Sequence, residues 1–208
     1  MKSKLTKNFE RNENISKKEK LKLCISSMSN EQKFKFWIKT LISSFNTFPE
    51  IIKTLDKIIE IQASSLSFAS DIYNKSKSTY NQVEKVIDLS ERKSSLLNIY
   101  IMSKKMIKSL SSDDFEFLEK RFIYNWSSEE LAKEFDISIR TVYRKTDKII
   151  DLIYDYCIKN NWSIKFIETQ IKEEGWLKEK YLKFVCDYFK NLNYNTGCIF
   201  QSKSSSES

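Results

Sequence analysis

Glycine and proline, which most tight turns require, are almost absent from this chain, since its 208 residues include two glycines and one proline. A sheet in a protein of this length needs many turns, and turns depend heavily on these residues. Hydrophobic residues make up 40% of the sequence, which is enough for a folded core rather than a disordered chain. The sequence therefore predicts an all-α fold of long helices with few tight turns.

Apolar residues recur at helical spacing early in the chain. Phe34, Trp37 and Leu41 share one face of a helix expected at about 30–45. Pro49 suits the first turn of the next helix, because the missing amide hydrogen of proline costs nothing there.

Longer apolar patterns follow at 51–59, 80–87 and 96–107. A serine-rich stretch at 64–78 could bend or loosen the helix, but it is not expected to be a linker. Helices of this length pack as a hairpin or a bundle, or they form a homodimer. The spacing does not keep a strict heptad, so an ordinary bundle is favoured over a coiled coil.

No segment approaches the roughly 20 apolar residues that span a bilayer. The basic N-terminus also lacks the apolar core and small-residue cleavage site of a secretory signal. We therefore expect a cytoplasmic protein with no membrane partner.

The net charge of +8 is unevenly distributed. Residues 1–25 contain eight Lys and Arg against three Asp and Glu, a net of +5. Such an arm can follow the phosphates of a nucleic acid, or it can be a solvated tail.

The four cysteines are scattered without a CxxC pair, at Cys24, Cys157, Cys186 and Cys198. The chain contains no histidine, which excludes zinc sites with histidine ligands and any histidine general base. A Gly-rich phosphate loop and a metal-spaced carboxylate group are also missing, and Asp113–Asp114 and Glu173–Glu174 are better explained as helix-end charges. We expect reduced thiols, no metal, no cofactor and no catalytic residues.

Residues 125–145, NWSSEELAKEFDISIRTVYRK, have the spacing of a helix-turn-helix. Ser127 and Glu130 form a capping box at the start of a helix over 127–135. Asp136 lies where a left-handed residue is needed, and Ser138 caps a second helix over 138–159. Within the motif, Val142 faces back onto Ala132. The same spacing could also belong to a helical corner that touches no DNA.

The second helix of this motif has two different faces. At about 100° per residue, Val142, Thr146 and Ile149 point inward while Arg140 and Arg144 lie nearly opposite. Arginines on the exposed face of such a helix can reach guanine O6 and N7 in the major groove. The predicted DNA-binding residues are Ser138, Ile139, Arg140, Thr141, Tyr143, Arg144, Lys145 and Lys148. Asp147, on the same face, is a mild objection to this assignment.

Residues 113–153, DDFEFLEKRFIYNWSSEELAKEFDISIRTVYRKTDKIIDLI, resemble the promoter-reading region 4 of bacterial sigma factors. In that region an LRY-like helix end is followed by the pattern S..EIA..L.IS..TV and a long helix. The matching residues here are Leu118–Phe122, Ser127, Glu130, Leu131, Ala132, Ile137, Ser138, Thr141 and Val142. The chain is also similar to sigma-like activators of phage late genes. The resemblance implies promoter DNA and RNA polymerase as partners.

Aromatic residues alternate with lysines between 176 and 190, a pattern that could stack bases but is better explained by core packing.

Ser111–Asp114 offers N-cap residues, Asn160–Asn161 ends the long helix, and Gly175 divides the segment after it. The predicted organisation is a basic flexible arm at 1–28, a helical domain at 29–110, the sigma region 4-like helix-turn-helix domain at 111–159, C-terminal helices at 160–195 and a disordered tail at 196–208.

These features favour a DNA-binding transcriptional regulator, either an ordinary one or an alternative sigma-like factor that recruits RNA polymerase to promoters. The alternative is a helical structural or interaction protein that does not bind DNA. An enzyme is the least favoured class.

Overall fold

A computed structural model describes residues 25–69 and 76–196, and this part of the chain is all-α, as predicted, with no strand. The elements are α3 (Asn30–Ser43), α4 (Thr47–Ala69), α5 (Ser76–Lys108), α6 (Ser112–Leu118), the π-helix η1 (Glu119–Ile123), α7 (Ser128–Glu134), α8 (Ile139–Lys159), α9 (Ile164–Gln170) and α10 (Gly175–Thr196). The expectations for the arm before residue 25 and the tail after 196 fall outside the described residues. Among the described helices, none is both long and apolar enough to cross a bilayer.

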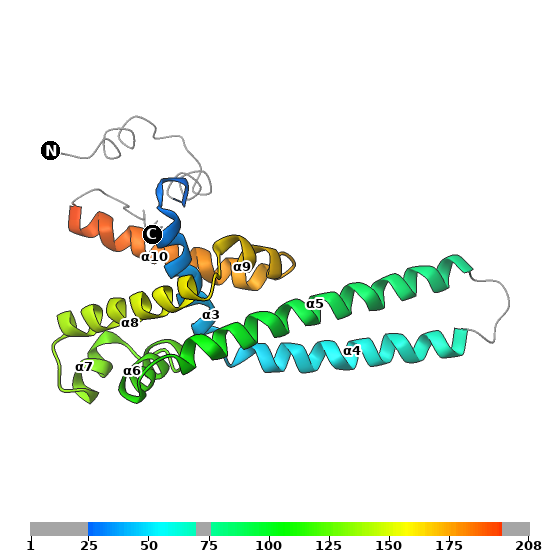
Figure 1. Cartoon of the computed structure of the whole chain (residues 1–208), viewed down its shortest axis with the longest axis horizontal. Helices are drawn as coiled ribbons and strands as arrows, with labels where there is room; N and C mark the ends of the chain where they lie inside the picture. The colour runs from blue at the N-terminus through cyan, green and yellow to red at the C-terminus, as the bar shows by residue number, and fades with distance from the viewer. Residues whose placement is uncertain (1–24, 70–75, 197–208) are drawn as a thin grey trace, which may run out of the picture.

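Helix α3 lies at the centre of the body and contacts α5, η1, α8, α9 and α10. It starts at a capping box in which the Ser29 hydroxyl accepts from the Gln32 amide at 3.1 Å and the Gln32 side chain accepts from the Ser29 amide. Ile38, Leu41 and Ile42 are completely buried. Because this helix is apolar on several sides, the other elements pack around it (Figure 1).

The aromatic residues of α10 pack against α3 and η1. The ring of Tyr181 stacks on that of Trp37 with centroids 4.2 Å apart, and Phe184 meets Phe122 edge-on at 6.3 Å. These contacts fit the core-packing explanation of the aromatic stretch rather than a base-stacking surface.

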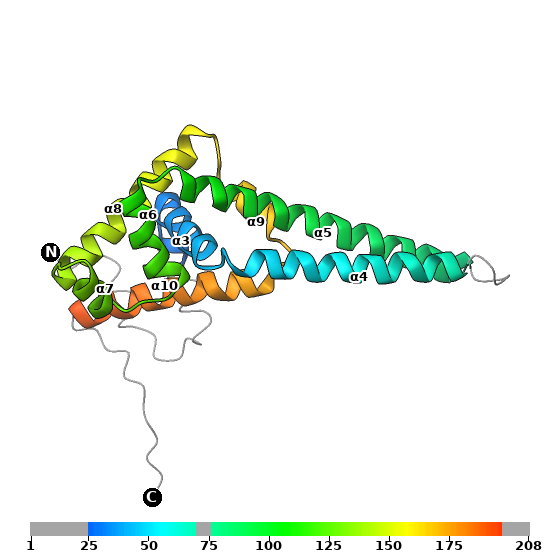
Figure 2. The same ribbon diagram turned by 90° about the horizontal axis from the view of Figure 1, so that it is seen from below.

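Helices α4 and α5 pack together as a hairpin, one of the arrangements left open by the sequence. Both views show this hairpin projecting away from the body (Figures 1 and 2). Leu55 of α4 and Leu96 and Ile99 of α5 are buried where the hairpin joins the body.

An ion pair between distant parts of the chain holds the hairpin to the body. The Glu174 carboxylate, 1% exposed, accepts from Arg92 Nε at 2.7 Å and Nη2 at 3.1 Å. It also accepts from the indole Nε1 of Trp176 at 2.7 Å. The sequence interpretation of Glu174 as a helix-end charge was incomplete, because the residue precedes α10 but is buried and paired.

Several helices begin or end at the residues that the sequence indicates. The Ser111 hydroxyl caps α6, Asn160 ends α8 with Asn161 at φ 57°, and α10 begins at Gly175. The buried apolar residues nevertheless form one cluster that runs from α3 through α8 to α10. The division near residue 110 stays a prediction about independent folding units.

Candidate nucleic-acid interface

The first helix of the candidate interface, α7, is held at its start by the predicted capping box. The Ser127 hydroxyl accepts from the Glu130 amide at 3.1 Å, and the Glu130 carboxylate accepts from the Ser127 amide at 2.6 Å. The bond from the Ser127 amide holds the pKa of Glu130 below its ordinary value, because it stabilises the charged carboxylate. The local sequence therefore fixes where α7 begins.

The turn between α7 and α8 is a Schellman motif with aspartate in the left-handed position. Asp136 has φ 49°, the Ile137 amide donates to the Ala132 carbonyl at 3.0 Å, and the Asp136 amide donates to Lys133 at 3.4 Å. This is the bonding that usually surrounds a glycine at the end of a helix. Ile137 and Ala132 also pack on the core, as the motif requires.

Helix α8 begins at the predicted cap. The Ser138 hydroxyl accepts from the Thr141 amide at 3.1 Å and lies 2.9 Å from the Thr141 hydroxyl. Two candidate DNA-binding residues therefore already stabilise the N-terminus of α8.

The two faces of α8 are arranged as the sequence predicts. Val142 is completely buried, Ile149 is 2% exposed, and the Thr146 hydroxyl donates to the Val142 carbonyl at 2.8 Å. The exposed candidates are Ser138, Ile139, Arg140, Tyr143, Arg144 and Lys148, while Thr141 and Lys145 are half-buried. Within the described residues, Arg140, Arg144 and Lys148 form no ion pair. Their charges are therefore available to an external anion.

Lys145 makes two cation–π contacts that could not be predicted from its charge alone. Its ammonium lies 4.9 Å from the ring centroid of Phe117 in α6 and 5.2 Å from that of Phe135. Such cation–π contacts hold the side chain against the supporting elements. Lys145 is thus less free to reach a ligand than Arg140 or Arg144.

Two of the three acidic residues of α8 are paired with a helix that lies about a hundred residues earlier. Lys39 of α3 lies 3.7 Å from Asp147, and Lys35 lies 2.8 Å from Asp151. Burial lowers the pKa of Lys39, and Asp147 acts in the opposite direction. Asp147 therefore does not stand as an isolated negative charge beside the basic face. This pairing could not be predicted from the sequence, since residue spacing within one helix says nothing about which elements pack against it.

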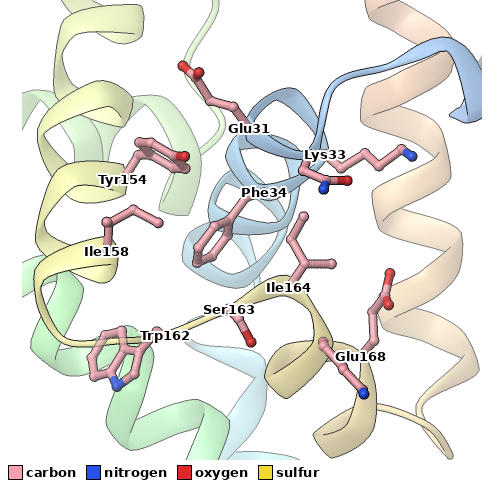
Figure 3. A pocket seen from close by; sticks show the side chains of 11 residues that line it. Glu31, Lys33, Phe34, Tyr154, Ile158, Trp162, Ser163, Ile164 and Glu168 are labelled. Atoms are coloured by element: carbon pink, nitrogen blue, oxygen red, sulfur yellow. The ribbon is translucent and has the colours of Figure 1, made fainter.

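A hollow of about 490 Å³ is lined by residues from the start of α3, the end of α8 and α9 (Figure 3). The rings of Phe34 and Tyr154, which both line it, meet edge-on with centroids 5.6 Å apart, and Trp162 and Ile164 also line the hollow. These contacts help to hold α3 against α8. In the part of the chain that the structure describes, no three His, Cys, Asp or Glu side chains are grouped as metal ligands.

The chain was compared with models of protein families, with curated proteins and with solved structures, and none of them matched. The resemblance to sigma region 4 therefore rests on residues 113–153 themselves and stays a prediction.

Proposed function

We propose that this chain binds double-stranded DNA by inserting α8 into the major groove, and that it regulates transcription. The observation that carries the proposal is the exposed basic face on the first three turns of α8. Arg140, Arg144 and Lys148 are exposed there and form no ion pair within the described residues, while Val142 behind them is completely buried.

The chemistry of that face suits a base-reading helix. The major groove is about 12 Å wide and admits an α-helix, and an arginine can donate two hydrogen bonds to guanine O6 and N7. Ile139 and Tyr143 are 43% and 54% exposed beside the arginines, so they can contact a thymine methyl group. Arg140 and Arg144 read bases in this proposal, and Lys148 contacts phosphate.

Helix α7 orients α8 rather than contacting phosphate. Its N-terminal half is acidic through Glu129 and Glu130, and phosphate repels these carboxylates. Glu134 at its end is paired with Lys120 of η1 at 2.6 Å. The capping box and the Schellman turn set the angle between α7 and α8, which determines how deeply the arginines can reach.

The wider role follows from the resemblance to sigma region 4. A domain of that kind brings RNA polymerase to a promoter, so the second partner in this proposal is the polymerase, and the setting is the cytoplasm. The basic arm over 1–28 adds contacts to phosphate, which strengthen binding without selecting a sequence.

A second candidate function is that of a helical interaction protein without DNA binding. The hairpin of α4 and α5 supports it, because the hairpin projects from the body and exposes apolar side chains such as Ile61 at 67% and Tyr80 at 69% (Figure 2). Large exposed apolar residues grouped together often mark a protein–protein contact.

Genome-wide capture of DNA by the tagged protein separates these functions, with RNA polymerase looked for in the same eluate. Discrete promoter peaks together with polymerase support the sigma-like role, and peaks alone support a regulator that binds DNA without the polymerase. Absence of peaks for the wild type, with other proteins recovered, contradicts the DNA-binding proposal and favours the interaction protein.

A further inference from the structure

Helix α5 has two apolar faces, and only one of them is used within the chain. Leu96 is buried in the core and Leu89 packs against it, while Val86 is half-buried. A second set of residues lies on the outer side of the same helix, and every member is exposed. These residues are Tyr80, Val83, Ile87, Ser90, Ser94, Leu97 and Ile101, named here the outer seam.

The outer seam keeps the spacing of a coiled coil without a break. Its members follow one another at intervals of three, four, three, four, three and four residues. Residues with this alternation lie along one line of a helix and pack into the spaces of a facing helix. Five of the seven are apolar and expose between 39% and 69% of their surface. A helix seam of this kind normally has a partner.

We propose that the occupant of the outer seam is the α5 helix of a second copy of this chain, running antiparallel. In one antiparallel alignment Val83 lies opposite Ile101 of the second copy, and Ile87 lies opposite Leu97 of the second copy. Ser90 then meets Ser94 of the second copy at the centre. Large residues face large ones and small residues face small ones, and the alignment is the same when the two copies are exchanged, as a twofold contact requires.

The centre of the seam is suited to close packing of two helices. The Ser90 hydroxyl donates to the Val86 carbonyl of its own helix at 2.8 Å, so it needs no further partner for its hydrogen when water is excluded. Serine is small, so the two backbones can approach closely at this point. The serines therefore allow contact on both sides of the axis instead of holding the helices apart.

The charges beside the seam give it no attraction for nucleic acid. Between residues 80 and 101, α5 carries three carboxylates, Glu84, Asp88 and Glu91, and three cations, Lys85, Arg92 and Lys93. Arg92 and Lys93 are paired with Glu174 and Asp56, so the seam has no basic excess to hold phosphate. The seam runs over 22 residues, from Tyr80 to Ile101, and is about 32 Å long at 1.5 Å of rise from each residue to the next. With its flanking residues it can supply the roughly 1,000 Å² of total buried area that a specific interface needs.

The dimer is independent of the DNA-binding proposal and is tested on the full chain alone. Sedimentation velocity from low micromolar to submillimolar concentration should show a monomer converting into a dimer. Ile87→Lys and Leu97→Glu should each weaken the dimer about tenfold or more, since each places two charges in the seam by symmetry. Ile61→Lys is the matched control, because Ile61 is an exposed isoleucine of α4 outside the seam, and it should leave the dimer unchanged.

The double variant I87K/L97E tests the alignment. In the antiparallel arrangement each new lysine lies opposite a new glutamate, so the double variant should recover much of the dimer that each single variant loses. In a parallel arrangement like charges would meet, and no recovery would occur. Circular dichroism would verify that each variant keeps its helix content. The proposal is overturned if the wild type stays monomeric throughout, if Ile61→Lys is as damaging as Ile87→Lys, or if the double variant recovers nothing.

Discussion

The carboxylate of Glu174 is buried between Arg92 and Trp176, and its two bonds to the Arg92 guanidinium span 82 residues of sequence. This pair connects the projecting α4–α5 hairpin to the loop before α10. The two partners differ in exposure, because Arg92 is 36% exposed and Glu174 is 1% exposed. Because the two side chains differ in exposure, replacing Arg92 and replacing Glu174 should lower the stability of the fold by different amounts.

Arg92→Ala should therefore destabilise the protein more than Glu174→Gln. Removing Arg92 leaves a buried carboxylate without its cation, at a cost of about 2–4 kcal/mol, whereas the Glu174→Gln amide can still accept a hydrogen bond and should cost about 1–2 kcal/mol. Urea unfolding of the two variants measures the difference. No loss with Arg92→Ala would show that the pair does not hold the hairpin, and equal losses would contradict the expected difference between the two partners.

Asp136 should tolerate glycine better than any residue with a Cβ carbon. Its φ of 49° disfavours most side chains, and a left-handed backbone costs them about 1–2 kcal/mol. Asp136→Gly should equal or exceed the wild type in thermal stability, and Asp136→Val should fall clearly below it. If valine is as stable as glycine, the turn between α7 and α8 does not have the geometry described.

Cys157 should be unreactive in the folded protein. The residue is fully buried, and burial raises the pKa of its thiol to about 12, so hardly any thiolate exists at neutral pH. Mass spectrometry after brief alkylation should find Cys157 unmodified and the half-buried Cys186 modified more. Both should react once urea unfolds the chain. Rapid native labelling of Cys157 would contradict its burial.

The basic arm should change how DNA binding depends on salt. Contacts to phosphate release counterions, so each lost contact reduces the slope of log affinity against log salt concentration by about 1. A chain lacking residues 1–24 should bind specific and scrambled DNA more weakly and with a flatter slope. An unchanged slope would mean that the arm is a solvated tail.

The bounds of the two helices between residues 127 and 159 could be predicted because the signals for them are local. Ser127 and Glu130 lie one helical turn apart, and Ser138 caps the helix that follows it. Two capped helices with one inward-facing row of apolar residues leave few other structures that residues 127–150 could adopt. The element bounds accordingly agree with the expectation to within one residue at each of these ends.

The two apolar faces of α5 could not be distinguished from the sequence in the same way. Apolar residues such as Val86 and Ile87 are adjacent in sequence yet lie on different faces, so the mixed pattern hid a regular outer seam. The charge pairs Lys39–Asp147 and Arg92–Glu174 were missed for a related reason. Each pair joins elements far apart in the chain, and residue spacing within one helix does not predict which distant side chain a residue contacts.

In the proposed function the exposed face of α8 reads DNA, and Arg144→Ala removes one of the two side chains assigned to base contacts. Arg144 is exposed and lies opposite the buried Val142, so its removal leaves the core intact. Val142→Ala is the contrasting variant, because it should lower thermal stability by roughly 0.5–3 kcal/mol as a core truncation does. Lys148→Ala should weaken binding to all sequences about equally.

The decisive measurement is the affinity of Arg144→Ala, by fluorescence anisotropy, for a site selected from random DNA and for a scrambled site of equal composition. We expect a loss of about 1–3 kcal/mol on the selected site, little change on the scrambled one, and an unchanged melting temperature. If Arg144→Ala binds both DNAs as the wild type does, α8 is not the reading helix and the account of this interface is wrong.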